Sequence, residues 1–515
     1  MGEKGGGVLQ RQLYLKNAAI MTATSLVLRA AGMVFRVYIA ARIGAQGMGV
    51  YQLVTTVYAL AVTLGTAGLS VAATRVCTDL MAGGRAGLVR GALRRMLALA
   101  LCAGVAAGAV LFAGAGAAAR WWLGDVRAAA ALRILAPSLP FMALSACMRG
   151  YFMARRSVSQ GARAQLLEQV VRIGVVAALL GRVPAGDTAA ACMAVVAGNT
   201  VSEAVSWAYL AACCRRDARA LPDGGAPAGL GRTLWGILAP IAANQYVSSA
   251  LHTAENVLAP ACLAVFLGSR DTALAQYGAL KGMALPVLFF PFSLLGTLSA
   301  LLMPEIAQAH VQNRRGALRR LVERVLLLTM TLSLLAGALF TLLARDIGQV
   351  LYQSDEIGFY LRILGPLAPF MYLESMVDGM LKGLNEQMST FRYTVLDSCA
   401  RIALTALLLP RAGMKGFLFV MLVSNLTTCL LNLHRLLYVT GVRFRLGKWL
   451  AGPAACAAAS AAAAGLALGP LRTALPQAVW AVCAGAAAAC VYGALLYLTG
   501  CVRRGDFATA GKAKK

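Results

Sequence analysis

The stretch Leu132-Arg133-Ile134-Leu135-Ala136-Pro137-Ser138-Leu139-Pro140-Phe141-Met142 occurs a second time, as Leu361-Arg362-Ile363-Leu364-Gly365-Pro366-Leu367-Ala368-Pro369-Phe370-Met371. The copies are 229 residues apart, and nine of the thirteen positions from 132 to 144 match their counterparts. Chance similarity between apolar helices does not preserve prolines and arginines in register. The chain is therefore a duplicated structure, which in membrane proteins is typical of transporters with two pseudo-symmetric halves.

The composition indicates a membrane protein. Hydrophobic residues make up 59% of the chain, charged residues 13%, and the mean hydropathy is +0.70, whereas soluble domains carry about 25% charged residues. Apolar runs of roughly 20 residues, enough to cross a bilayer, recur along nearly the whole length. The net charge of +28 lies in short loops rather than on one stripe, which argues against nucleic-acid binding.

The sequence contains no recognisable catalytic or metal-binding motif. The thirteen cysteines lie mostly in apolar runs and form no CxxC pair, so they are expected to be small buried residues. The three histidines are not arranged as HExxH, and there is no GxSxG or P-loop. We therefore expect no enzyme activity, no cofactor and no metal site, and any transport would need an ion gradient, the membrane potential or the substrate itself.

Fourteen spanning helices in an all-α polytopic fold fit the apolar runs. They are expected at approximately 17–40, 50–74, 96–119, 128–152, 164–181, 188–213, 233–264, 275–303, 321–344, 358–381, 393–410, 416–434, 449–468 and 476–499. Proline removes a helix hydrogen bond and kinks the segment. Interruptions are therefore expected in spans 4, 8 and 10, at Pro137, Pro140, Pro286, Pro291, Pro366 and Pro369.

The basic residues alternate between the two sides of this topology. Connections on one side, together with both termini, hold 30 Lys and Arg residues, whereas those on the other side hold nine. Because cytoplasmic loops are enriched in Lys and Arg, the first side is predicted to be cytoplasmic. An odd number of spans would break the alternation. The sequence thus predicts a multi-pass protein of the cell membrane with both termini in the cytoplasm.

The two copies of the repeated stretch fall in spans 4 and 10. Six spans separate them, so the halves have the same orientation and are related by a pseudo-two-fold axis along the membrane normal. The expected division is an N-lobe at 1–214, a cytoplasmic linker at 215–232, a C-lobe at 233–440, spans 13 and 14 at 441–502 and a basic cytoplasmic tail at 503–515. Spans 13 and 14 are expected to face lipid or to support a lobe, with a substrate groove as the alternative.

Basic side chains inside spans are candidate substrate ligands. An ionised side chain at mid-bilayer costs at least about 2.5–3.5 kcal/mol on insertion scales, so it should face water or a partner. Arg29 and Arg36 lie two helical turns apart in span 1, and Lys281 lies in span 8. Facing a water-filled cavity, these cations would attract an anionic group such as a diphosphate. Snorkelling to the interface or a structural ion pair is the alternative.

Buried acids are candidate sites for a coupling ion, Na+ or H+. Glu255 lies in span 7, and Glu374 and Asp378 share one face of span 10. Each could equally neutralise a cavity arginine. At the repeat offset Arg149 corresponds to Asp378 and Ser145 to Glu374, and this asymmetry marks Arg149 as a further candidate for substrate binding.

Two acid–arginine pairs recur in the halves and are expected to be architectural. Glu168 and Asp397 each precede an arginine, Arg172 or Arg401, by four residues. Carboxylate and guanidinium at this spacing lie on the same side of a helix.

The first spans resemble a known family. Leu28–Tyr38, Ile43–Leu53 and Thr66–Ala72 are similar to the start of the stage V sporulation protein B family, polysaccharide-biosynthesis proteins of the multidrug/oligosaccharidyl-lipid/polysaccharide (MOP) exporter superfamily. A weaker resemblance to the MurJ lipid II flippase family implies that Arg29, Arg36 and Lys281 hold a lipid diphosphate. That family's arginine in the second span has no counterpart before Arg75.

The resemblance implies a flippase that moves an undecaprenyl-diphosphate-linked oligosaccharide or peptidoglycan precursor across the cell membrane by alternating access, for spore cortex synthesis in the most specific version. Its partners would be the lipid-linked saccharide and membrane lipids, and the chain is expected to be a monomer. The alternatives are a cation-coupled multidrug antiporter of the same superfamily and a non-transporting membrane scaffold for cell-wall synthesis.

Overall fold

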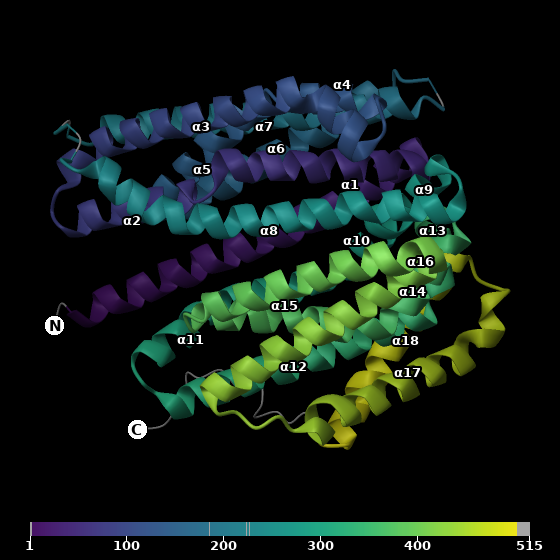
Figure 1. The fold of residues 1–515 in the computed structure, drawn as a ribbon. Coiled ribbons are helices and arrows are strands. Elements are labelled where there is room, and N and C mark those ends of the chain that lie inside the picture. The colour runs from purple at the N-terminus through teal and green to yellow at the C-terminus, as the bar shows by residue number, and fades with distance from the viewer. Residues whose placement is uncertain (1–2, 185, 223, 226, 502–515) are drawn as a thin grey trace. The chain divides into compact units, whose positions relative to one another are not determined.

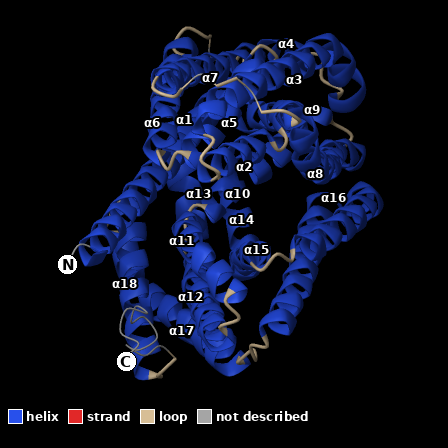
Figure 2. Cartoon of the chain, turned by 90° about the vertical axis from the view of Figure 1, so that its left-hand side faces the viewer, coloured by secondary structure: helices blue, strands red, loops and turns tan. Residues whose placement is uncertain are grey.

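A computed structural model of the chain describes residues 3–184, 186–222, 224–225 and 227–501. Within these residues all regular secondary structure is helical, and Figure 2 shows helices and loops without a strand. The fourteen predicted spans fall in helices. The predicted tail at 503–515 lies outside the described residues.

The first compact unit comprises Met1–Gly278. In this unit α5 packs against α2, α3 and α7, while α8 and α9 pack against α1 (Figure 1). The described α-helices of the unit are α1 (Glu3–Thr66), α2 (Leu69–Ala82), α3 (Val89–Ala117), α4 (Arg127–Leu135), α5 (Ser138–Ala154), α6 (Val158–Leu180), α7 (Thr188–Arg219), α8 (Leu230–Leu267) and α9 (Arg270–Tyr277).

The second compact unit comprises Ala279–Lys515. Here α15 packs against α11, α12 and α16, and the C-terminal pair α17 and α18 packs against α12. The described α-helices of this unit are α10 (Leu285–Phe289), α11 (Phe292–Val311), α12 (Arg315–Leu342), α13 (Ala344–Tyr352), α14 (Asp355–Leu364), α15 (Ala368–Gly383), α16 (Gln387–Thr440), α17 (Gly452–Leu468) and α18 (Gln477–Leu498).

Among the described residues, nine helical segments are long and apolar enough to cross a membrane. Nine segments accommodate eleven of the predicted spans, because α1 and α16 each contain two. Each of these long helices breaks at a glycine with positive φ, Gly44 (φ 69°) and Gly413 (φ 57°), a backbone conformation that favours glycine. The other three predicted spans are helical, but α6 carries charged residues and spans 8 and 10 are interrupted.

The helices break at the proline pairs of spans 4 and 10 and at Pro291 of span 8, as predicted, whereas Pro286 is the second residue of α10 and follows a π-helical segment without a break. Helix α4 ends at Leu135 and α5 begins at Ser138, and 229 residues later α14 ends at Leu364 and α15 begins at Ala368. In span 8, α10 ends just before Pro291 and α11 begins just after it. The duplicated stretch therefore has the same broken-helix geometry in each unit.

The second predicted span differs from its expected bounds. Its helix does not end at residue 74 but continues through α2 to Ala82, after a break at Gly68. Arg75, which the loop-charge pattern assigned to a connection, is therefore on a helix, and its side chain is exposed.

A short connection in the second unit contains an acid-sensitive contact. Glu386 Oε2 accepts a hydrogen bond from Ser389 Oγ at 2.7 Å and pairs with Arg435 Nη2 at 2.9 Å. The Ser389 hydroxyl and the Arg435 guanidinium hold the pKa of Glu386 below its usual range. Such a carboxylate stabilises the fold above its unfolded pKa of about 4.3, and this stabilisation is lost as the pH falls through the folded pKa.

We therefore expect the melting temperature of the protein in detergent to fall between about pH 5 and pH 3, and the Glu386→Gln variant to show a shallower decline. The difference should correspond to at most about 1 kcal/mol, because the pair is partly exposed. Thermal unfolding at a series of pH values measures both slopes. Identical slopes would contradict a role for this contact.

Candidate functional site

A polar groove of about 620 Å³ lies between α1 and α8 in the first unit. Eleven of its twelve lining residues have polar side chains, and none is an Asp, Glu, Lys or Arg. The lining residues are Gln52, Thr55, Thr56, Ala59, Thr63, Asn244, Gln245, Ser248, Ser249, His252, Thr253 and Asn256. Its volume lies in the usual range for small-molecule sites, roughly 300–1,000 Å³.

Helical periodicity creates the groove. On each helix the lining residues recur every three or four positions, from 52 to 63 on α1 and from 244 to 256 on α8, so each helix presents one polar stripe. Ser249 lies midway along α8, 19 residues from Leu230 and 18 from Leu267, or about 27 Å from either end. The polar stripe therefore lies midway along a helix long enough to span the membrane, and polar side chains inside a membrane are costly unless they face a cavity or a partner.

The hydrogen bonds in the groove are mostly local. The Oγ1 atoms of Thr56 and Thr253 donate to the carbonyl oxygens of Gln52 and Ser249, each at 2.8 Å. These hydroxyls keep acceptor capacity toward the groove. The side-chain amides of Gln52 and Gln245 make no hydrogen bond within the described part of the chain. The groove therefore offers both donors and acceptors to a ligand.

Glu255, a predicted ion-coupling residue, lies beside this groove. It is 2% exposed, and its Oε2 is 4.0 Å from Nδ1 of His252, a lining residue. Tyr277 of α9 donates to Oδ1 of Asn256 at 3.1 Å. A buried carboxyl group in a spanning helix, next to a polar cavity, is a candidate functional group.

The second half of α1, which follows the break at Gly44, begins in close contact with α9. Gly49 and Gly278 lie at this contact, where a Cβ atom on Gly49 would overlap the backbone of Leu274 and one on Gly278 would overlap the backbone of Ala45. Gln52, the first lining residue, follows Gly49 by less than one turn. The groove is thus bordered at this end by two helices in backbone contact.

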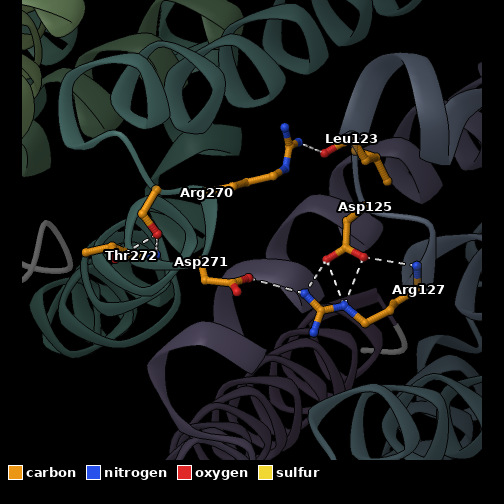
Figure 3. Close-up of polar contacts among 7 residues, drawn as sticks. Leu123, Asp125, Arg127, Arg270, Asp271 and Thr272 are labelled. Carbon is orange, nitrogen blue, oxygen red and sulfur yellow. Dashed lines mark hydrogen bonds and ion pairs between the residues drawn. The ribbon is translucent and has the colours of Figure 1, made fainter.

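A network of ion pairs joins the loop before α4 to the start of α9 (Figure 3). Arg127 Nη2 contacts Asp125 Oδ2 at 3.0 Å and Asp271 Oδ1 at 3.4 Å, and Arg270 donates to the carbonyl oxygen of Leu123. Both connections belong to the side of the topology that is poor in basic residues. Their contact agrees with the prediction that both connections lie on the same side of the membrane. We call this network, with Gly49 and Gly278, the α1–α9 closure.

The predicted substrate cations are not among the residues that line the groove. Arg29 is exposed and Arg36 half-buried on the first half of α1, and neither makes an ion pair within the described residues. Gly32, between them, faces Gln169 of α6. Lys281 belongs to the second unit, in a π-helical segment (Gly278–Ala284), with Nζ 5.8 Å from the ring centre of Phe417.

Arg149 lies on α5 near a buried charged cluster of the first unit. Arg172 Nη2 pairs with Glu168 Oε1 at 2.5 Å and lies 3.8 Å from Glu203 Oε1. Arg149 is an electrostatic neighbour of Glu203. The pair Glu168–Arg172 is present within α6 as the sequence predicts, and the contact of Arg172 with Glu203 links α6 to α7.

Glu374 and Asp378 lie on α15, near the equivalent pair in the second unit. Arg401 Nη2 contacts Asp397 Oδ2 at 2.7 Å, so the second predicted pair is present, and Glu374 is an electrostatic neighbour of both residues. Asp378 pairs with Lys382 Nζ at 2.6 Å. Asp378 therefore has a partner four residues along its own helix.

Sequence reasoning missed most of the groove. None of its lining residues was among the predicted site residues. The signal was present as Asn, Gln, Ser and Thr repeating every three or four residues in spans 2 and 7. These side chains carry no charge, so a search for charged side chains passes over them.

Comparison with known proteins places these features in a family. A model of the polysaccharide biosynthesis protein family matches residues 14–310, and a MatE family model matches residues 239–407. Stage V sporulation protein B of Bacillus subtilis (strain 168) is 24% identical over 436 residues, covering 82% of this chain and 83% of that protein.

Two solved structures share the fold. The lipid II flippase MurJ, in an inward closed conformation, has a TM-score of 0.69 at 12% identity and covers 94% of this chain and 98% of its own. An inward-facing multidrug resistance MATE family transporter of the MOP superfamily has a TM-score of 0.67 at 13% identity, and the match covers 82% of this chain and 98% of the transporter. With the long apolar helices, these likenesses show a multi-pass α-helical membrane protein. Because the first family model matches more than half of its residues, the chain belongs to the polysaccharide biosynthesis protein family.

Proposed function

We propose that this protein is a flippase that moves a lipid-linked oligosaccharide, such as an undecaprenyl-diphosphate-linked peptidoglycan precursor, across the cell membrane by alternating access. The observation that carries the proposal is the uncharged polar groove between the spanning helices α1 and α8. These helices come from different sequence repeats, and transporters built from repeats bind substrate at the repeat interface near the bilayer midplane. The names of two similar proteins, a sporulation protein and a lipid II flippase, support spore cortex synthesis as the setting.

The chemistry of the groove fits a saccharide. A sugar hydroxyl both donates and accepts hydrogen bonds, and so do the amides and hydroxyls of the lining. A groove without Lys or Arg offers little to a diphosphate, and one without Asp or Glu offers little to a cationic drug. The groove would therefore hold the sugar, whereas the diphosphate would be held by Arg29 and Arg36, with Lys281 and Arg149 as further candidates.

The driving force is proposed to be a cation or the membrane potential. Glu255, beside the groove, is the first candidate to bind H+ or Na+, and Glu374 and Asp378 are the others. Movement of the groove between the two faces of the membrane would involve opening of the α1–α9 closure, which joins elements of different repeats. We propose that the side of this closure is extracytoplasmic, in agreement with its few basic residues.

Reconstitution in liposomes tests the proposal, with a fluorescent undecaprenyl-diphosphate disaccharide as the probe and its leaflet distribution as the readout. Ser249→Leu should lower the flipping rate at least about tenfold, because it removes a hydrogen-bonding hydroxyl and fills the groove. Ala250→Leu adds similar bulk at the next residue, which is exposed but does not line the groove, and should leave the rate unchanged. Arg29→Ala and Arg36→Ala should each lower the rate if they hold the diphosphate.

Other outcomes would point elsewhere. A native rate for Ser249→Leu would remove the groove from the substrate path, and native rates for both arginine variants would remove the diphosphate assignment. Exchange of a cationic dye for H+ or Na+ without saccharide flipping would identify a multidrug antiporter. The absence of any transport would favour a non-transporting membrane scaffold for cell-wall synthesis.

A further inference from the structure

A second groove, of about 810 Å³, opens on the first unit away from the polar groove, among α3, α5 and α7. Four arginines line it, Arg90, Arg94, Arg95 and Arg215, and its apolar walls include Leu97 and Trp207. No carboxylate is among its lining residues in the described chain. We call it the arginine groove.

The charges and the apolar atoms are separated along the length of the groove. On α3 the arginines occupy the first two turns, and Leu97 follows them. On α7 Arg215 lies near the C-terminal end and Trp207 lies eight residues earlier, about 12 Å along the helix. The groove therefore has a cationic end and an apolar end, like the two parts of a phospholipid.

The cationic end lies at the depth of lipid head groups. Trp121 and Trp122, which follow α3 in the same helical run, are 84% and 51% exposed, as expected of residues at a membrane interface. Arg94 is 27 residues before Trp121, or about 40 Å along the helix. A bilayer with its head groups is about 40–45 Å thick, so the arginines reach the opposite interface.

Three of the arginines are available to a ligand. Arg94, Arg95 and Arg215 are exposed and form no ion pair or hydrogen bond within the described residues. Arg155, at the end of α5, is by contrast paired, with its Nε 3.1 Å from Asp217 Oδ2. Three unpaired cations converging on one concavity favour an anion as the occupant.

We propose that the arginine groove binds an anionic glycerophospholipid, with the phosphate on Arg94, Arg95 and Arg215 and an acyl chain along Leu97 and Trp207. Basic pockets between spanning helices recognise anionic head groups in this way. The site is separate from the flippase proposal and would make the stability of the first unit depend on the lipid. A soluble anion would leave the apolar end unfilled, and a second protein copy would need carboxylates at this position.

Quenching of Trp207 tests the proposal. The full chain is placed in phosphatidylcholine nanodiscs with either brominated phosphatidylglycerol or brominated phosphatidylcholine, and Trp207→Phe identifies the Trp207 signal. Brominated phosphatidylglycerol should quench Trp207 at a mole fraction at least about fivefold lower than the mole fraction of brominated phosphatidylcholine that gives the same quenching. In Arg94→Gln/Arg215→Gln this preference should disappear. In Arg85→Gln/Arg216→Gln, which removes two exposed charges outside the groove, it should remain.

A second measurement does not depend on Trp207. Added phosphatidylglycerol should raise the melting temperature of the native protein and of Arg85→Gln/Arg216→Gln, but not that of Arg94→Gln/Arg215→Gln. Equal quenching by both lipids would overturn the proposal, as would equal loss of preference in both double variants. Displacement of phosphatidylglycerol by inorganic phosphate would also overturn it in favour of a phosphate site, and loss of quenching in a crosslinked dimer would overturn it in favour of a subunit interface.

Discussion

Asp397→Asn should lower the free energy of unfolding by about 3 kcal/mol, because it leaves a buried guanidinium without its carboxylate. Arg401 Nη2 lies 2.7 Å from Asp397 Oδ2, and the two side chains are only 18% and 10% exposed. Asp397 Oδ1 also accepts a hydrogen bond from Ser424 Oγ at 2.5 Å. Gly413 breaks α16 between Asp397 and Ser424. The hydrogen bond from Ser424 to Asp397 therefore joins the two halves of the helix.

The magnitude is at the lower end of the range for broken buried pairs, about 3–5 kcal/mol. Glu374 is an electrostatic neighbour of Arg401 and would compensate part of the lost charge. Asparagine preserves the side-chain volume, so the loss reports the charge and not a cavity.

Asp378→Asn provides the matched control in the same unit. Its pair with Lys382 also joins residues four apart, but the side chains are 31% and 52% exposed, so its loss should cost at most about 1 kcal/mol. Thermal unfolding in one detergent measures all three proteins. Equal melting temperatures for the two variants would show that burial of the Asp397–Arg401 pair contributes nothing.

Gly49→Val should open the α1–α9 closure. A side chain at Gly49 would overlap the carbonyl group of Leu274, so α1 and α9 cannot pack as they do here. If the polar groove alternates between the two faces of the membrane, the variant should favour the conformation that is open at this end. A cysteine replacing Ser249, in a background without the native cysteines, would report this as at least about tenfold faster labelling by a membrane-impermeant maleimide from the side of Asp271.

Two further variants distinguish opening from misfolding. Gly174→Val places the same side chain on α6, where a Cβ meets no atom within 4 Å, and should leave the labelling unchanged. Asp271→Asn breaks the bridge to Arg127 without a steric clash. Because that pair is exposed, it should raise the labelling rate by no more than about fivefold, in the same direction as Gly49→Val. Unchanged labelling in both Gly49→Val and Asp271→Asn would mean that this contact does not control access to the groove.

Features that depend on residues close in the chain could be predicted. The broken helices follow from Pro137, Pro140, Pro366 and Pro369, and the pairs Glu168–Arg172 and Asp397–Arg401 follow from their four-residue spacing. The continuation of span 2 through α2 was not predicted, because the charges of Arg75 and Asp79 end the apolar run although these residues extend a helix beyond Gly68.

Contacts between distant segments could not be predicted in this way. Gln52 and Ser249 face the same groove although 197 residues separate them, and neither has a charge that would have drawn attention to it. The charge-based search instead selected Arg29, Arg36 and Lys281, which the described contacts do not bring into the groove. In the second unit it also selected Asp378, which is paired with Lys382.

The membrane class, the duplication and the alternation of loop charge follow from the amino-acid order alone, because hydropathy, repeats and loop composition are properties of consecutive residues. The polar groove, the α1–α9 closure and the arginine groove required the packed helices. Each of these sites combines side chains from helices far apart in the sequence, and the rotation of each helix about its axis determines which residues meet. That rotation is set by packing, through close approaches such as that of Gly49 to Gly278, and a linear pattern does not contain it.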